Sequence, residues 1–183
     1  MMEETWELKD LFQIIKKRLL LIVTLTVVAI TIAGVVSYLF LTPIYQASSQ
    51  MLVNKQENKS MMYETNEIQT NLQLISTYNV IIKSPVVLDA VRKELDLDLT
   101  TEALDRKITV SSVDDSQVIN LVVQDESAER AAKIADKTAE VFNEEITDIM
   151  NVNNVTILTK AKVNQAPIKP NPKLNMAIAA VLG

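Results

Sequence analysis

The stretch that decides the fold is LLLIVTLTVVAITIAGVVSYLFL, residues Leu19–Leu41, which contains no charged residue. At a rise of about 1.5 Å per residue, a helix of this length extends roughly 34 Å, enough to cross a hydrocarbon core of about 30 Å. The run is apolar on every face, which disfavours a helix buried in a soluble domain. The sequence therefore predicts a transmembrane helix.

A cleaved signal peptide is the main alternative interpretation of this run. The run is longer than the roughly 7–15 apolar residues of a signal sequence, and the leader before it contains several acidic residues. No cleavage site of the A-x-A type follows it. We therefore favour an anchor that stays in the membrane.

The charges on either side of the run predict its orientation. Lys16, Lys17 and Arg18 directly precede it, whereas no Lys or Arg follows until Lys55. The positive-inside rule then places the N-terminus in the cytoplasm and the chain from Thr42 onward outside the cell membrane.

The leader, residues 1–18, allows two interpretations. It either lies on the membrane surface as an amphipathic helix or continues the membrane helix into the cytosol. Apolar residues at helical spacing support the first, and the single tryptophan, Trp6, suits the interface. These apolar residues are Leu8, Leu11, Phe12 and Ile15.

The region after the span predicts an α+β domain with the order β-α-α-β-β-α-β. Its first half alternates like a strand, with Ala47, Ser49, Met51 and Val53 on one face, and then turns to helical spacing. Ser84 and Pro85 mark a helix start, and Thr100 or Thr101 caps a short turn through Arg106. The expected elements are a strand at Tyr45–Val53, a helix at 64–83 and a helix at Pro85–Leu95.

The second half predicts a β-hairpin, a long helix and a closing strand. Two β-branched runs flank residues 114–117, and Ser127 can cap a helix with small residues on one face. If the first and last strands pair, the two membrane-proximal ends of the domain come together. The elements are strands at Ile108–Val113 and Val118–Gln124, a helix to Met150 whose stripe runs from Ala128 to Ile149, and a strand at Val155–Val163.

Composition excludes several functional classes. The chain has no histidine, no cysteine and two glycines, so it lacks the usual acid–base, thiol and zinc chemistry and the glycine-rich phosphate loops. The net charge of −5 gives no support for nucleic-acid binding. The carboxylate pairs read as solvated loops or faces: Asp96 with Asp98, Asp114 with Asp115, and Glu144 with Glu145. We expect no enzyme, no metal and no cofactor.

Charge is unevenly distributed along the domain. No acidic residue follows Asp148, and the charged residues beyond it are Lys160, Lys162, Lys169 and Lys173. These lysines either contact anionic lipid head groups or a polyanionic polymer, or they serve ordinary solubility and snorkel at the membrane interface.

The chain ends with QAPIKPNPKLNMAIAAVLG, residues 165–183. Pro167, Pro170 and Pro172 stiffen the approach to a second apolar run, and Lys169 and Lys173 suit its outer interface. From Asn175 the run covers only roughly 14 Å as a helix, less than half a bilayer. We expect the first part of a second membrane helix, with a soluble terminal helix as the alternative.

The expected organisation is therefore a cytosolic leader (1–18), a membrane helix (19–41), an extracytoplasmic domain (42–166), a proline-rich basic segment (167–173) and part of a second membrane helix (174–183). Within it, six motifs occur in a characteristic order: ELKDLFQIIKKR, LTPIYQASSQMLV, IQTNLQLISTYNVIIKSPVVLDAV, VINLVV, AERAAKIADKTAEVF and AKVNQAPIKPNPKLN. This order resembles the Wzz-type chain-length determinants, or polysaccharide co-polymerases. Within that family it is similar to the Gram-positive modulators of a cytosolic bacterial tyrosine kinase in capsule or exopolysaccharide synthesis.

The resemblance implies a non-enzymatic scaffold with two membrane helices and a ring-like homo-oligomer. It implies work with the polysaccharide polymerase and flippase machinery, and activation of a kinase through a cytosolic tail after the second span. Residues 1–183 alone would lack that tail and are expected not to activate a kinase. The alternative is a two-span sensor or receptor, although few aromatic residues are present to stack on sugars.

Overall fold

The computed structural model describes residues 16–53, 76–112, 116–150 and 155–182. It forms two compact units, which we treat separately. One comprises Met1–Pro43 with Lys169–Gly183, and the other comprises Ile44–Ile168. The predictions for the leader, for the helix before residue 76 and for Asp114 and Asp115 lie outside the described residues.

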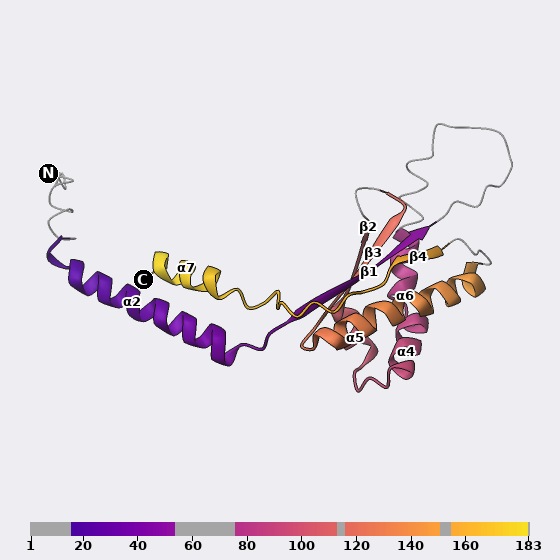
Figure 1. The fold of residues 1–183 in the computed structure, drawn as a ribbon, viewed down its shortest axis with the longest axis horizontal. Coiled ribbons are helices and arrows are strands. Elements are labelled where there is room, and N and C mark those ends of the chain that lie inside the picture. The colour runs from indigo at the N-terminus through magenta and orange to yellow at the C-terminus, as the bar shows by residue number, and fades with distance from the viewer. Residues whose placement is uncertain (1–15, 54–75, 113–115, 151–154, 183) are drawn as a thin grey trace, which may run out of the picture. The chain divides into compact units, whose positions relative to one another are not determined.

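The first unit contains an apolar helix and a shorter partner. Helix α2 (Leu19–Val35) continues into the π-helical segment η1 (Val36–Phe40), and α7 (Pro172–Leu182) packs against α2 (Figure 1). By length and composition Leu19–Phe40 can cross a membrane, with a mean hydropathy of 2.8. Its threonines donate their hydroxyl protons to carbonyls four residues earlier, which removes the cost of polar groups in lipid.

The second unit is built on a four-stranded antiparallel sheet in the order β2-β3-β1-β4. The strands are β1 (Tyr45–Val53), β2 (Ile108–Ser112), β3 (Val118–Asp125) and β4 (Val155–Thr159). The predicted hairpin is confirmed as the β2–β3 pair. The first and last strands, whose pairing the sequence left open, do pair as β1 and β4.

Helices cover one side of this sheet (Figure 1). They are a helical segment at 76–82, α4 (Pro85–Glu94), α5 (Thr101–Lys107) and α6 (Ala128–Met150). The predicted buried face of β1 and the small-residue stripe of α6 form the core with Tyr78, Leu88 and Leu104. This arrangement confirms the predicted α+β class, and α5 is the short capped turn expected through Arg106.

The core stripe of α6 ends earlier than the sequence predicts. Burial continues through Ile146, but Ile149 is 48% exposed. Thr147 and Asp148 are exposed as well, so the last turn of the helix extends beyond the core.

Two of the three predicted helix caps form hydrogen bonds. Thr100 Oγ1 accepts the N–H of Ala103 at 3.2 Å, and Ser127 Oγ accepts the N–H of Arg130 at 3.3 Å. Ser84 occupies the N-cap position before Pro85, yet its side chain makes no capping bond. At that helix start the fixed φ of proline, rather than the serine hydroxyl, defines the first turn.

The closing strand is shorter than predicted and ends at Thr159 rather than Val163. The reason is a side chain of α6: Asp136 Oδ1 accepts the N–H of Ala161 at 2.6 Å and the hydroxyl of Ser49 at 2.7 Å. Because this carboxylate takes the N–H of Ala161, residues 160–164 leave the sheet as an irregular segment.

Candidate functional site

The helix pair of the first unit is held by a polar contact. Asn175 Nδ2 of α7 donates to Ser37 Oγ at 3.1 Å, and Ser37 is 2% exposed. Ser37 lies in η1, where the π-helical turn is a local departure from regular α-helix of the kind often found at functional positions. Hydrogen bonds between membrane helices are typical of specific pairing, because lipid offers no competing partner.

The two helices also meet beside this bond, where Gly34 lies next to Met176. A Cβ placed on Gly34 would lie 3.5 Å from Met176 Sδ, which is ordinary van der Waals contact. Residues of α2 that face α7 are shielded relative to the rest of the helix, which otherwise remains exposed. The shielded set is Thr26, Ala29, Ile30, Ala33, Gly34 and Ser37 on the first helix, with Pro172, Asn175, Met176 and Ala179 on the second.

This geometry predicts a cross-link in the membrane. The chain has no cysteine, so a Gly34→Cys/Met176→Cys pair can be oxidised without background. We expect an intramolecular disulfide, formed about threefold less readily when Asn175→Ala removes roughly 0.6 kcal/mol of helix pairing. Val35→Cys/Met176→Cys is the matched control at the same depth, because Val35 is 44% exposed. Equal yields from both pairs would contradict the observed packing.

The basic residues predicted to flank the membrane lie at both ends of the helix pair. Lys16, Lys17 and Arg18 are exposed just before α2. Lys169 and Lys173 are also exposed, and they lie close to Asn175, whose bond to Ser37 places them at the opposite end of the apolar helix. The apolar pair is therefore flanked by positive charge on both sides.

The proline-rich segment leads into α7. Pro172 is the first residue of that helix, Pro167 is exposed, and the Lys169–Pro170 peptide is cis. Asn171 Oδ1 accepts the N–H of Leu174 at 3.3 Å and caps the helix. The cap at Asn171 and the contact between Ser37 and Asn175 were missed by sequence reasoning. An asparagine just before a proline was the available signal for the cap.

The two ends of the second unit meet. The N–H of Ile168 donates to the carbonyl of Ile44 at 2.8 Å, beyond the pairing of β1 with β4. These are the residues through which the domain connects to the proline-rich segment and to the apolar helix. The first and last residues of this unit therefore lie side by side.

A buried carboxylate fixes the start of α6. Asp125, at the end of β3, is 1% exposed, and its Oδ1 accepts the N–H of Ser127 at 2.9 Å and Nε of Arg130 at 2.7 Å. Lys107 Nζ lies 3.1 Å from Oδ2. Burial alone would raise the pKa of Asp125, but these three donors outweigh it and hold the pKa below its ordinary value of 3.8.

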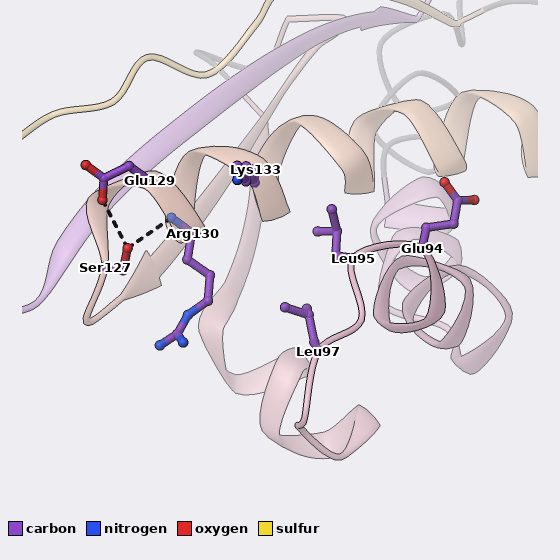
Figure 2. A pocket seen from close by; sticks show the side chains of 7 residues that line it. All are labelled: Glu94, Leu95, Leu97, Ser127, Glu129, Arg130 and Lys133. Carbon is purple, nitrogen blue, oxygen red and sulfur yellow. Dashed lines mark hydrogen bonds between the residues drawn. The ribbon is translucent and has the colours of Figure 1, made fainter.

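A cavity of about 410 Å³ lies between the end of α4 and the first turns of α6. Figure 2 shows Leu95 and Leu97 on one wall, facing Ser127 and Arg130 on the other. Glu94, Glu129 and Lys133 complete the lining, so charges of both signs surround two leucines. These lining side chains do not form a nucleophile–base pair, so we interpret the cavity as a structural cleft.

The described residues contain no cluster of three or more potential metal-ligating side chains. Among the carboxylates singled out from the sequence, Asp96, Asp98 and Glu144 are exposed, and Glu145 is half-buried. The arrangement is suited to attachment through the apolar helix α2, to pairing of α2 with α7, and to recognition at the surface of the α+β domain.

The comparisons with known proteins agree on one family. The model of the Wzz chain length determinant protein family matches residues 4–95. The chain is 51% identical to the probable capsular polysaccharide biosynthesis protein YwqC of Bacillus subtilis, over all of this chain and 74% of that protein. It is 39% identical to the capsular polysaccharide biosynthesis protein CapA of Staphylococcus aureus, over 97% of this chain and 80% of CapA. It is 37% identical to YveK of Bacillus subtilis, over all of this chain and 79% of YveK.

Proposed function

Because the chain belongs to the Wzz chain length determinant family, we propose that it is a membrane-anchored, oligomeric scaffold that regulates the length and export of capsular or extracellular polysaccharide. The observation that carries the proposal is a domain whose two ends meet through the Ile168–Ile44 bond, in a chain whose apolar helices pair through Asn175 and Ser37. The process, polysaccharide biosynthesis, is supported by the similarity to capsular polysaccharide biosynthesis proteins along the whole chain.

The scaffold acts without catalysing a reaction of its own. The absence of histidine and cysteine from the sequence removes the commonest acid–base and nucleophilic groups. Assembly into a ring-like homo-oligomer concentrates the partners that each subunit holds. The raised local concentration of these partners, and not a reaction catalysed by the chain, then produces the effect. These partners are the polymerase and flippase machinery and a cognate cytosolic tyrosine kinase, the latter supported by the resemblance of the motifs.

We further propose that the N-terminus is cytoplasmic and the α+β domain extracytoplasmic. Lys16, Lys17 and Arg18 outnumber the basic residues at the other end of the apolar helix, Lys169 and Lys173, and the positive-inside rule follows this bias. Membrane lipid is then a direct partner of both basic flanks.

Polysaccharide length in cells tests the proposal. In an encapsulated Gram-positive host that lacks its own homologue, the protein is expected to restore the narrow length distribution, measured by size-exclusion chromatography of the released polymer. The exposed substitution Glu144→Gln serves as a control and should restore it equally.

Two results would contradict the proposal. One is a polymer length distribution that does not depend on the protein at matched expression. The other is a detergent-solubilised chain that stays strictly monomeric at micromolar concentration by native mass spectrometry, because a monomer gathers no partners.

A further inference from the structure

A second groove of the domain, which shares no lining residue with the cleft of Figure 2, has a volume of about 360 Å³. It is formed by the first half of β1 and the irregular segment that follows β4. Its size falls within the roughly 300–1,000 Å³ of small-molecule sites. The lining residues are Gln46, Ala47, Ser48, Thr159, Lys160, Lys162, Asn164 and Ile168.

The charge of this groove is entirely positive. Two lysines line it, and no Asp or Glu does. Lys160 Nζ lies 3.4 Å from Glu140 Oε1, but Glu140 also pairs with Lys137 at 3.1 Å, so its charge is shared. Lys162 is exposed and forms no ion pair within the described part of the chain. The groove is therefore open to an anion.

The amides of the groove present nitrogen donors. Gln46 Oε1 accepts Nε2 of Gln124 at 3.2 Å, and Asn164 Oδ1 accepts the N–H of Ala166 at 3.1 Å. Because protein donors already occupy both amide oxygens, the NH₂ groups are left for a ligand. Together with the two ammonium groups they form a set of donors, which suits carboxylate, phosphate and hydroxyl oxygens.

The protein fixes the shape of this groove through α6. Asp136 holds the N–H of Ala161, which lies between the two lysines, and the hydroxyl of Ser49, which follows Ser48. This carboxylate thus sets the irregular segment against β1. The groove is a built feature rather than a chance cluster of surface lysines.

A polar row extends from the groove along the sheet. Residues of β1 alternate, so Gln46, Ser48 and Gln50 lie on the face opposite the core. Cross-strand partners continue the row, with Gln50 opposite Asn120 and Asn120 opposite Ser111. An extended polar track favours a polymer with many hydroxyl groups over the head group of a single lipid.

We propose that this groove binds an acidic polysaccharide chain, with Lys160 and Lys162 pairing with its carboxylate or phosphate groups and the amides bonding to its hydroxyls. The inference rests on the proposed function and names the site by which the scaffold contacts its polymer. Recognition depends on charge and hydrogen bonds, which is consistent with the scarcity of aromatic residues for stacking.

Direct binding tests the inference. The probe is a fluorescently labelled oligogalacturonate, a carboxylated glycan, added to the full chain in nanodiscs of neutral phosphatidylcholine, with labelled dextran of equal length as the uncharged comparison. We expect anisotropy to report salt-sensitive binding of the oligogalacturonate only. The Lys160→Gln/Lys162→Gln variant should weaken it about tenfold or more, because each lost ion pair is a charge-assisted hydrogen bond.

The matched control is Lys93→Gln/Lys133→Gln, which removes the same charge from two exposed lysines outside the groove. Equal weakening by both variants, equal binding of dextran, or no binding of oligogalacturonate to the wild type would overturn the inference. So would retention of phosphatidylglycerol from mixed nanodiscs that depends on Lys160 and Lys162 without glycan binding. Failure here leaves the cellular length assay unaffected, whereas failure of that assay alone leaves the binding result standing.

Discussion

Replacing Asp125 with alanine is expected to lower the free energy of unfolding of the α+β domain by about 3 kcal/mol or more. The carboxylate is 1% exposed and receives Arg130, Lys107 and the N–H of Ser127. Truncation leaves a half-buried ammonium and a backbone donor without their partner, which costs more than the original pair contributes. Pulse proteolysis of the full chain in detergent, across a urea series, measures the change.

An exposed ion pair supplies the control for this prediction. Lys83 and Asp105 lie 3.1 Å apart with side chains 37% and 39% exposed. Asp105→Ala should therefore cost less than about 1 kcal/mol. If the two alanine variants lost equal stability, burial of Asp125 would not be the cause.

The same carboxylate gives the domain a pH dependence. The pKa of Asp125 is held below its ordinary value of 3.8, so the unfolded state binds the proton more readily than the folded state. Its contribution is complete above that value and is lost as the pH falls through the lower, folded pKa. The Asp125→Asn variant should be less stable at neutral pH, and its stability should fall less than that of the wild type on acidification below pH 3.8.

Replacing Phe142 with alanine is expected to cost about 3–5 kcal/mol, enough to leave the domain largely unfolded near body temperature. The ring is 0% exposed and meets Tyr78 edge-on, with centroids 5.9 Å apart and planes at 69°. Truncation opens a cavity beneath α6 and removes an aromatic pair. Thermal unfolding followed by circular dichroism in detergent measures the loss.

Val80→Ala is the control for the aromatic variant. Val80 lies on the same helical segment as Tyr78 but is 70% exposed, so the change should stay within about 0.5 kcal/mol. A cooperative transition at the wild-type temperature for Phe142→Ala would show that α6 does not hold the core.

Local sequence patterns predict most of the fold. The alternation in β1, the β-branched runs of the hairpin and the small-residue face of α6 each predict an element within a few residues of its observed bounds. Thr100 and Ser127 cap the helices they precede, because a side chain that bonds two or three residues onward needs no distant partner. The basic and proline residues of the candidate site were likewise visible as composition.

The misplaced ends have non-local causes. Val155–Val163 is uniformly strand-like in sequence, yet pairing stops at Thr159 because Asp136, on another element, takes the N–H of Ala161. Ile149 continues the stripe of α6 in sequence, but the last turn of the helix extends beyond the core. Neither of these ends can be predicted from the residues next to it.

By itself, the sequence determined that an uncharged helix long enough to span a membrane precedes an α+β domain, and that histidine and cysteine chemistry is absent. These properties depend on residue type and spacing along the chain. Only the tertiary structure decided that Asn175 bonds to Ser37, that Asp125 is buried among its donors, and that Lys160 and Lys162 line one groove with Gln46. The physical reason is that each of these contacts joins residues distant in the chain, and strand order and helix packing bring them together.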